Sequence, residues 1–313
     1  MLTKEEYNML YAQYVETGLC PPELVPYKVE NLVIIAAGLA SRFAPLSLET
    51  PKGLLRVRGE VLIERIIRQA QEAGIQDVAV VVGYKKELFA YLRDEFHVRI
   101  FENNEYATRN NHSSIYCARS ILGNSFICPS DIYFMENPFK PYMYCSSYSA
   151  LFSPGRTHEW CLELDENDRI VGVSIGGENA WYMNGDSYLD RAFSKKIIEI
   201  IDLNYNTPEI QNKYWENIFI DHIDELYMEA RKIKKTTFFE FDTFAELKSF
   251  DPNFLNQNES VVFDQICSTL DCNKTDINDI YPIDNSSSRN LFHLSTCHGE
   301  YLYDYATASM EAL

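Results

Sequence analysis

The sequence predicts an α/β fold: a doubly wound, mostly parallel sheet with helices on both faces, together with an antiparallel subregion. Two observations support this prediction. Apolar and amphipathic stretches alternate from residue 31 to residue 134 in the order strand, helix, strand, helix, strand, helix, strand. The strand expected at 77–83, DVAVVVG, is apolar throughout, as a parallel strand covered on both faces should be.

The elements follow in order along the chain. A helix is expected at 3–16, where Thr3 can cap the first turn and Tyr7, Leu10, Tyr11 and Tyr14 recur at helical spacing. Three prolines end it before the first strand. The main series comprises strands at 31–37, 77–83, 98–103 and 125–134 and helices at 59–75, 85–96 and 112–122.

The second half adds strands and then helices. A hairpin turn is expected at Glu166–Asp168, between strands that supply the antiparallel subregion. The remaining elements are strands at 146–153, 160–177, 180–190 and 236–242 and helices at 192–205, 212–226 and 243–251. From residue 256 the chain becomes polar, with few core signals. We therefore expect an N-terminal helical extension (1–28), a main domain (29–255) and a C-terminal extension (256–313).

The composition excludes several classes of function. With 28 Lys and Arg against 46 Asp and Glu, the net charge is −18, which disfavours binding to nucleic acid and to anionic membranes. No apolar segment can span a bilayer, and no secretory signal is present. The eight cysteines lack C-x-x-C pairs, which favours free thiols in a cytoplasmic protein. Cys297-His298 is too isolated in the sequence to predict a metal site.

The loop after the first strand carries the chemistry. The stretch VIIAAGLASRFAPLSLETPKGLL (33–55) places small residues where a parallel sheet binds ligands, so backbone N–H groups can contact phosphate oxygens. Arg42 and Lys52 add two cations, which predicts that both contact a triphosphate. The dinucleotide fingerprint G-x-G-x-x-G and the Walker loop are absent. An ordinary strand–turn–helix connection is the alternative.

The stretch AAGLASRFAPLSLETPK resembles the A-A-G-x-G-[ST]-R-…-P-K signature of nucleotidyltransferases that make NDP-sugars and CDP-alcohols. Ala40 stands where the signature usually has a second glycine. Later segments resemble one branch, the CTP:phosphocholine cytidylyltransferases, in the expected order over residues 30–251. These segments are GEVLIERIIRQAQEAGI, VVVGYKKELFAYL, NNHSSIYCA, SDIYF, EWCLELDENDRIVGV, YWENIFIDHIDEL and FFEFDTFAEL.

The resemblance implies a Rossmann-like nucleotidyltransferase fold and a reaction. A phosphate oxygen would attack the α-phosphorus of CTP, and pyrophosphate would leave with the help of Mg²⁺. Arg42 and Lys52 would be the catalytic cations on the β- and γ-phosphates. Carboxylates would hold the metal: Asp131 at a strand end, with Glu240 and Asp242 on one face of a strand. A turn-capping Asp131 and a solvated strand face are the alternatives.

The resemblance also assigns contacts to the nucleotide. They come from the first loop, the strand end around VVGY and the polar run Asn110–Ser114. Asn pairs also mark turns and helix caps, so the Asn110-Asn111 pair is a weak signal by itself. The expected nucleotide-binding residues are Ala36, Ala37, Gly38, Leu39, Ala40, Ser41, Gly83, Tyr84, Asn111, Ser113 and Ser130.

Aromatic residues in the second half suggest the acceptor. A quaternary ammonium group cannot donate hydrogen bonds, and proteins bind it on aromatic faces, often with a carboxylate nearby. The resemblance selects Trp160, Tyr188, Asp190 and Trp215 as substrate-binding residues, while Trp181 is treated as core. Burial of all these aromatic residues in the core is the alternative.

Both ends of the chain resemble pieces of other domains. The first helix is similar to the start of a winged-helix unit but too short to form one, so no DNA binding is expected. The segment 272–306 resembles the opening of a choline-kinase-like domain. It stops before any catalytic loop, so we expect a remnant without kinase activity, either poorly ordered or packed on the transferase.

These observations predict a cytoplasmic, Mg²⁺-dependent enzyme that joins CTP and phosphocholine into CDP-choline and pyrophosphate. No nucleic acid or membrane partner is expected, and a homodimer stays open. One alternative is the same transfer to a sugar 1-phosphate or another phosphorylated alcohol. A second, from a different class, is a non-catalytic nucleotide-binding regulatory protein.

Overall fold

The computed structural model describes residues 2–283 and 290–313, and these residues form two compact units. Unit 1 comprises residues 1–38, 67–129 and 134–239, and unit 2 comprises residues 39–66, 130–133 and 240–313. This division follows contacts in space, whereas the domain boundaries expected near residues 28 and 255 follow composition and stay predictions. Each unit is described by itself.

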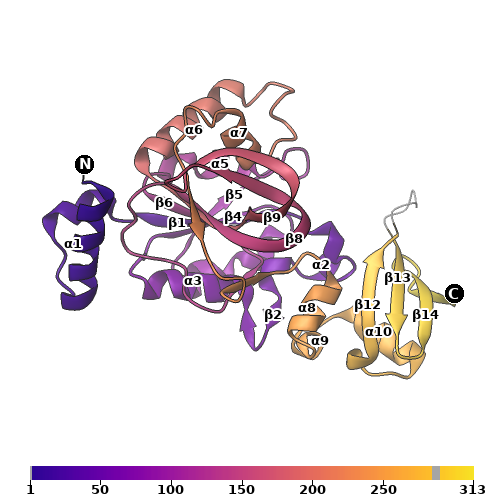
Figure 1. Cartoon of the computed structure of the whole chain (residues 1–313). Helices are drawn as coiled ribbons and strands as arrows, with labels where there is room; N and C mark the ends of the chain where they lie inside the picture. The colour runs from indigo at the N-terminus through magenta and orange to yellow at the C-terminus, as the bar shows by residue number, and fades with distance from the viewer. Residues whose placement is uncertain (1, 284–289) are drawn as a thin grey trace. The chain divides into compact units, whose positions relative to one another are not determined.

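Unit 1 is built on a seven-stranded sheet with the order β10-β8-β9-β6-β1-β4-β5 (Figure 1). Strands β4, β1 and β6 pair in parallel, as do β4 with β5 and β10 with β8, while β9 runs antiparallel to both neighbours. The predicted doubly wound, mostly parallel sheet is therefore confirmed. Its strands are β1 (Asn31–Ala36), β4 (Val78–Val82), β5 (Arg99–Glu102), β6 (Ser125–Pro129), β8 (Ser147–Leu164), β9 (Ile170–Leu189) and β10 (Glu229–Lys232).

Helices cover the sheet because its strands are apolar on both faces. The five residues of β4 are all buried. On one face α5 (His112–Ala118), α6 (Arg191–Asn204) and α7 (Trp215–Asp221) contribute to one hydrophobic cluster with alternate residues of the sheet. That cluster includes Val33, Ala79, Val81, Ile115, Ile127, Ile197 and Phe219. The other alternate residues, Leu32, Ile34, Val80 and Val82, are also buried. Short helical segments η4 (Lys86–Phe89) and α4 (Tyr91–Phe96) lead into β5.

The N-terminal helix forms as predicted. Helix α1 (Lys4–Thr17) begins with a capping box in which Thr3 and Glu6 bond each other's backbone N–H, and it ends on the left-handed Gly18. The helix stripe and the segment η1 (Pro22–Tyr27) surround a small aromatic cluster in which Tyr7 packs on Tyr27 and Tyr144. This cluster is separate from the core of the sheet.

Two expected elements differ from the structure. The strand expected at 125–134 is broken, because β6 ends at Pro129 and β7 (Ile132–Phe134) begins after a turn at Ser130–Asp131. Pro129 has no N–H, which favours the end of a strand. The three strands expected at 146–190 are two long strands, β8 and β9. The turn predicted at Glu166–Asp168 connects them, and Asp168 there has a φ of 64°.

Unit 2 holds the segments that follow β1 and β6 together with the C-terminal part of the chain. The short elements η2 and β2–β3 come early in the chain, and α3 begins in this unit. Its elements are η2 (Ser41–Phe43), α2 (Leu46–Glu49), η3 (Lys52–Leu54), β2 (Arg56–Val57), β3 (Glu60–Val61), α3 (Leu62–Glu72), α8 (Phe244–Phe250), α9 (Phe254–Gln257), α10 (Val261–Leu270) and η6 (Lys274–Asp276). Strand β11 (Phe238–Glu240) belongs to unit 1 except for Glu240.

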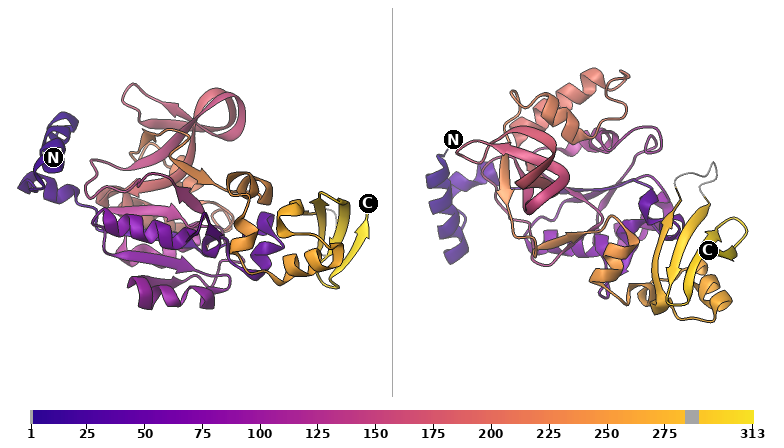
Figure 2. Two further views of the ribbon diagram at one scale, coloured as in Figure 1. Left: turned by 90° about the horizontal axis from the view of Figure 1, so that it is seen from below. Right: turned by 45° about the vertical axis from the view of Figure 1, so that its right-hand side comes forward.

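The C-terminal extension is folded, so the expectation of a polar tail with few core residues is wrong for the described residues. Strands β12 (Ile277–Pro282), β13 (Leu291–Thr296), β14 (Gly299–Asp304) and β15 (Ser309–Ala312) form an antiparallel sheet (Figure 2). Alternate residues of β13 are buried, and so are Phe263 and Ile266 of α10. The resemblance of this segment to a kinase domain stays a prediction, and residues 284–289 of it lie outside the described residues.

In the described part of the chain, no helix combines the length and the apolar character needed to cross a bilayer.

The core of the C-terminal sheet provides a test of its stability. The ring of Phe292 is fully buried, so Phe292→Ala should lower the free energy of unfolding of this region by about 3–5 kcal/mol. Hydrogen exchange of β12–β14 would measure the effect locally. The control Glu311→Ala changes an exposed residue of β15 and should leave exchange unchanged. Equal exchange in both variants would contradict a packed core here.

Candidate active site

The predicted nucleotide loop begins where two parallel strands end together. Ala36 and Ala37 are buried, whereas a Cβ added to Gly38 would meet nothing within 4 Å. The N–H of Tyr84 donates to the carbonyl of Ala37 at 3.0 Å, which joins the ends of β1 and β4. Small residues therefore leave open space beside the backbone at Gly38, as a loop that approaches a ligand requires.

Gly83 is constrained by packing rather than by a left-handed backbone. A Cβ at this position would lie 2.7 Å from the ring of Tyr106. Any side chain would push that ring away from the end of β4. The glycine thus lets Tyr106 cover the strand end directly before Tyr84.

Two expected base-reading residues are already bonded inside unit 1. The amide nitrogen of Asn111 donates to Glu216 at 3.1 Å, and its oxygen accepts from the Trp215 N–H at 2.8 Å. Ser113 is fully buried, donates to the Asn110 carbonyl and accepts from Asn103. Asn111 and Ser113 therefore join the start of α5 to α7 and β5. Their side chains are not directed to a free base edge as expected.

In unit 2, the loop continues through Leu39 and Ala40 to Ser41 at the start of η2. Ala40 has φ 51° and ψ 53°, the left-handed region that glycine adopts without strain. Alanine thus takes the conformation for which the signature usually provides glycine. Ser41 and Arg42 follow as exposed residues.

Both predicted catalytic cations form ion pairs with predicted metal ligands. Lys52 Nζ lies 2.9 Å from Asp131 Oδ2, and only 7% of the lysine side chain is exposed. Arg42 Nη2 lies 2.8 Å from Asp242 Oδ1, with 70% of the arginine exposed. The Lys52 pair is the stronger constraint, because an exposed ion pair contributes little. Lys52 also lies 5.0 Å from the centre of the Phe43 ring.

Gly53 holds this arrangement together. A Cβ on Gly53 would lie 2.8 Å from both the Cβ and the Oγ of Ser130 and 3.2 Å from its carbonyl oxygen. Ser130 itself is buried. The residue after Lys52 therefore packs against the residue before Asp131, which brings the two charged side chains together.

The carboxylates fit Mg²⁺ in their chemistry. Asp131, Glu240 and Asp242 all lie in unit 2 and offer the hard oxygen donors that Mg²⁺ prefers. Glu240 and Asp242 are half-buried and Phe241 is buried between them. Because β11 ends at Glu240, Asp242 follows the strand and does not share its face with Glu240 as predicted. Within the described residues, these three carboxylates do not converge as a group of three ligand atoms. Two of them contact Lys52 and Arg42 instead.

Tyr188 and Asp190 are not acceptor residues in this structure. Tyr188 is fully buried and pairs with Phe126 at the start of β6, whereas the nucleotide loop follows the opposite ends of the parallel strands. Asp190 caps α6 by accepting from the N–H groups of Ala192 and Phe193. Both line a cavity of about 660 Å³ beside the N-terminal segment. The prediction for this pair is therefore wrong.

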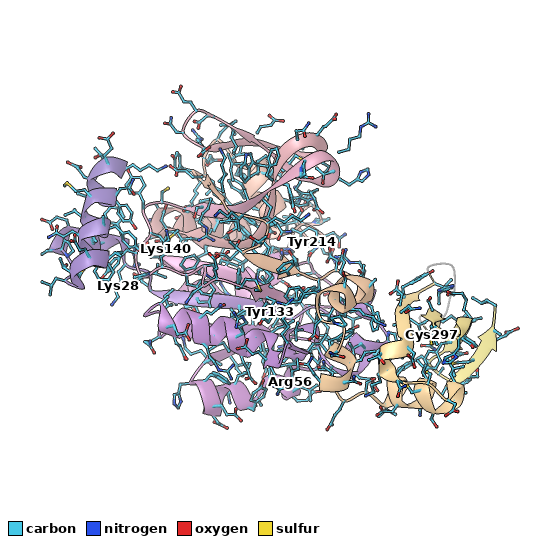
Figure 3. The ribbon with its side chains drawn as sticks, turned by 60° about the horizontal axis from the view of Figure 1, so that its bottom comes forward. Lys28, Arg56, Tyr133, Lys140, Tyr214 and Cys297 are labelled. Carbon is cyan, nitrogen blue, oxygen red and sulfur yellow. The ribbon has the colours of Figure 1, made fainter. Side chains whose placement is uncertain are left out.

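Trp215 and Trp160 lie elsewhere in unit 1. The Trp215 ring is 2% exposed and stacks on Tyr148 at 5.9 Å between centroids. Trp160 is half-buried and meets Tyr214 edge to face at 6.0 Å. Tyr214, which is labelled in Figure 3, directly precedes α7. Both tryptophans pack on the same hydrophobic cluster.

The sequence analysis missed the carboxylate beside Trp215. Glu216 accepts from Asn111 Nδ2 at 3.1 Å and from Tyr148 OH at 3.2 Å. Burial raises the pKa of Glu216 to about 7, and the hydrogen bonds from Asn111 and Tyr148 oppose this shift. The adjacent pair Trp215-Glu216 was the available signal. A perturbed carboxylate bonded to an aromatic hydroxyl is a typical ligand-binding group.

Comparisons with known proteins show which family the chain resembles. Residues 32–149 match the MobA-like NTP transferase domain. A 2-aminoethylphosphonate cytidylyltransferase of Lancefieldella rimae is 35% identical over 229 residues, covering 72% of this chain and 93% of the relative. A choline-phosphate cytidylyltransferase of Streptococcus pneumoniae is 31% identical over 226 residues, covering 72% of this chain and 99% of the relative.

The chain belongs to this family of cytidylyltransferases. A solved structure of the CTP:phosphocholine cytidylyltransferase from Streptococcus pneumoniae matches with a TM-score of 0.68 and 32% identity, covering 71% of this chain and 97% of the solved one. The chain is thus a nucleotidyltransferase with the fold predicted from its sequence.

Gly53 and Gly38 provide a matched pair of cytidylyltransferase variants. Gly53→Ala should force Ser130 away, lower the free energy of unfolding by about 1–3 kcal/mol and reduce turnover at least about tenfold. Gly38→Ala has room for its methyl group, so it should leave stability unchanged. The methyl group would occupy the open space beside the loop backbone, so the KM for CTP should rise. Urea unfolding and steady-state kinetics would measure both. A stable and fully active Gly53→Ala variant would contradict the role of this contact.

Ala40 tests the backbone of the loop. Ala40→Gly removes the conformational cost of a left-handed alanine, about 1 kcal/mol, from the folded state. It also raises the conformational entropy of the unfolded chain by a similar free energy, so the free energy of unfolding should change by less than about 1 kcal/mol. Ala40→Val should weaken CTP binding, because a β-branched residue strongly disfavours a φ of 51°. Isothermal titration with CTP would compare them. Equal CTP affinity of the valine variant would refute the need for this conformation.

Proposed function

We propose that the chain transfers CMP from CTP to phosphocholine, giving CDP-choline and pyrophosphate in the presence of Mg²⁺. The observation that carries the choice of acceptor is the Glu216 carboxylate, which is bonded to Tyr148 and adjacent to Trp215. An ammonium group is stabilised by a negative charge and by nearby aromatic rings, and this cluster combines a carboxylate with two aromatic side chains.

The hydrogen bonds around Glu216 favour a quaternary ammonium. Asn111 and Tyr148 both act as donors to the carboxylate, and the Asn111 oxygen is used by the Trp215 N–H. Within this cluster Glu216 is the negatively charged acceptor. A primary ammonium has three N–H donors to satisfy, whereas a trimethylammonium has none.

The charged residues of unit 2 support the transfer itself. In the proposed reaction, Lys52 and Arg42 contact the β- and γ-phosphates, and Asp131, Glu240 and Asp242 hold Mg²⁺. When bound, Mg²⁺ neutralises triphosphate charge. Each cation now contacts a carboxylate. With nucleotide present, Lys52 keeps a negative partner when its contact changes from Asp131 to phosphate, so its buried charge stays compensated.

The bond changes need no general base. An oxygen of the acceptor phosphate, already anionic near neutral pH, attacks the α-phosphorus of CTP. The bond from the α-phosphorus to the bridging oxygen breaks, and the electron pair leaves with pyrophosphate. The protein contributes by positioning the reactants and by stabilising negative charge through Lys52 and Arg42.

2-Aminoethylphosphonate is the second candidate acceptor, because the 35% identical relative is named for it. It shares with phosphocholine an anionic phosphorus group and a cationic nitrogen. The two acceptors differ at that nitrogen, which is a primary ammonium in one and a trimethylammonium in the other. The hydrogen-bond argument at Glu216 therefore separates them.

Pyrophosphate release with Mg²⁺ tests the proposal. CTP, UTP, ATP and GTP are each tried with phosphocholine, 2-aminoethylphosphonate, phosphoethanolamine and glucose 1-phosphate. The highest kcat/KM with CTP and phosphocholine supports it. Preference for 2-aminoethylphosphonate would contradict the proposed acceptor but not the proposed transfer of CMP. Preference for glucose 1-phosphate would contradict the proposed ammonium site. Nucleotide binding without turnover supports the regulatory alternative.

Glu216→Gln tests the acceptor site directly. The change removes the negative charge at nearly constant shape, so the KM for the acceptor should rise about 10- to 100-fold while the KM for CTP changes little. Glu199→Gln, an exposed change on α6, is the matched control and should behave as wild type. An equal rise in both KM values would indicate a general loss of structure instead.

The pH dependence provides a separate test. Because the pKa of Glu216 is raised to about 7, the carboxylate is charged above that pH and neutral below it. Acceptor affinity should therefore fall as the pH decreases from 8 to 6. The phosphate of the acceptor titrates equally with the wild-type enzyme and with Glu216→Gln. The acceptor KM of Glu216→Gln divided by that of the wild type therefore reports the titration of Glu216 alone. This ratio should shrink toward one at pH 6, and a constant ratio would contradict the assignment.

A further inference from the structure

Metal-ligating side chains that are far apart in the sequence converge at the C-terminal sheet of unit 2. The thiol of Cys297, the imidazole of His298 and the carboxylate of Asp276 place their ligand atoms within 4.8 Å of one another. Cys297 and His298 form the turn between β13 and β14, and Figure 3 marks Cys297 among the side chains of this sheet. In the sequence, Cys297 and His298 are isolated from other metal-ligating residues, whereas the fold places Asp276 beside them.

The backbone fixes the positions of these ligands. The Cys297 N–H donates to the Asp276 carbonyl at 2.9 Å, which joins the hairpin turn to η6. The Asn273 N–H donates to Asp276 Oδ2 at 2.8 Å and orients the carboxylate. The His298 N–H donates to the Thr296 hydroxyl across the turn. The ligands thus come from two elements joined by backbone hydrogen bonds.

A further thiol, that of Cys272, interacts electrostatically with this group but does not belong to the set within 4.8 Å. Asp271 ends α10 in a left-handed conformation, after which the Cys272 N–H donates to the Cys267 carbonyl at 3.0 Å. The thiols of Cys267 and Cys272 are hydrogen-bonded to each other, and Cys272 interacts electrostatically with Asp276 and Cys297.

We propose that Cys272, Asp276, Cys297 and His298 bind one Zn²⁺ ion, which joins the end of α10, η6 and the β13–β14 turn. Two thiolates, an imidazole and a carboxylate form a four-ligand set that suits tetrahedral Zn²⁺, whereas Mg²⁺ prefers oxygen donors alone. Cys267 supports Cys272 through its hydrogen bond. The site is independent of the proposed function, since it lies in the C-terminal sheet.

The charges balance with one nearby lysine. On binding, each cysteine releases one proton to solvent and coordinates as a thiolate, so the site with Zn²⁺ carries one net negative charge. The Lys248 ammonium interacts electrostatically with both Asp276 and Cys297 and donates to the carbonyls of Thr275 and Ile277. It can compensate that charge.

The expected role of the ion is structural. The core of this sheet is small, and a metal that joins three of its connections adds stability when the hydrophobic core is limited. A catalytic Zn²⁺ keeps one ligand position open, whereas this set fills all four. Binding should therefore stabilise the C-terminal sheet.

Cobalt substitution and metal analysis test the site in the full chain. The protein is purified under reducing conditions, freed of metal with a chelator and titrated with Co²⁺ and then Zn²⁺. One tightly bound ion per chain, thiolate-to-cobalt charge-transfer bands and the strong visible bands of tetrahedral cobalt are expected. Weak octahedral bands without charge transfer would overturn the proposal.

Variants assign the ligands. Cys297→Ser and His298→Gln should each weaken Zn²⁺ binding at least about 100-fold and abolish its stabilisation of β12–β14 in hydrogen exchange. The controls Cys20→Ser and His158→Gln change exposed residues of unit 1 and should bind as wild type. Equal affinity in all four variants would overturn the assignment. Circular dichroism of the metal-free variants separates ligand loss from misfolding.

Thiol counting excludes the competing chemistry. Eight reactive thiols in the denatured, metal-free protein are expected, because every described cysteine is free. A disulfide joining Cys272 to Cys267 or to Cys297 under the same reducing conditions would remove a ligand and overturn the zinc site. Protection of Cys297 from alkylation by Zn²⁺, with Cys20 remaining reactive, would support it.

Discussion

The buried ion pair between Lys52 and Asp131 is the constraint on which the catalytic half of the molecule depends. The Lys52 side chain is 7% exposed, and burying its ammonium group without a negative partner costs free energy. The loop after β1, which carries Lys52, and the turn after β6, which carries Asp131, must therefore contact each other. Gly53 permits this because a side chain there would collide with Ser130. In the proposed reaction the contact of Lys52 changes from carboxylate to phosphate, which gives a protein with a net charge of −18 a cation for the triphosphate.

The proposed acceptor site around Glu216 depends on hydrogen bonds and not on an ion pair. Glu216 is held by two donors and by the start of α7, and Asn111 bridges α5 and α7. Burial keeps its pKa near 7, so a cationic ligand would both compensate the carboxylate and favour its charged form. The family relation establishes cytidylyl transfer, and this local chemistry supports an alkylammonium acceptor.

Periodicity and loop signals predicted most of the fold. The apolar run of β4, the cap at Thr3 and the turn after β8 are local features, and each was found as expected. Sites that depend on long-range pairing were harder to predict. Tyr188 looked like an acceptor residue because aromatic residues cluster in that half, but β9 places it beside the start of β6. The alternation in β13 was a usable core signal that its polar surroundings obscured. Cys297-His298 gained a partner only when folding brought Asp276 close.

A double-mutant cycle on Lys52→Met and Asp131→Asn tests the central claim most directly, with stability and CTP turnover measured on each variant. Each single change should cost about 3 kcal/mol of stability and most of the turnover, since it leaves a buried charge unpaired. The double variant should recover stability without recovering turnover, because Lys52 and Asp131 also act on the triphosphate and its metal. Recovery of turnover together with stability would show a purely structural ion pair and contradict the account.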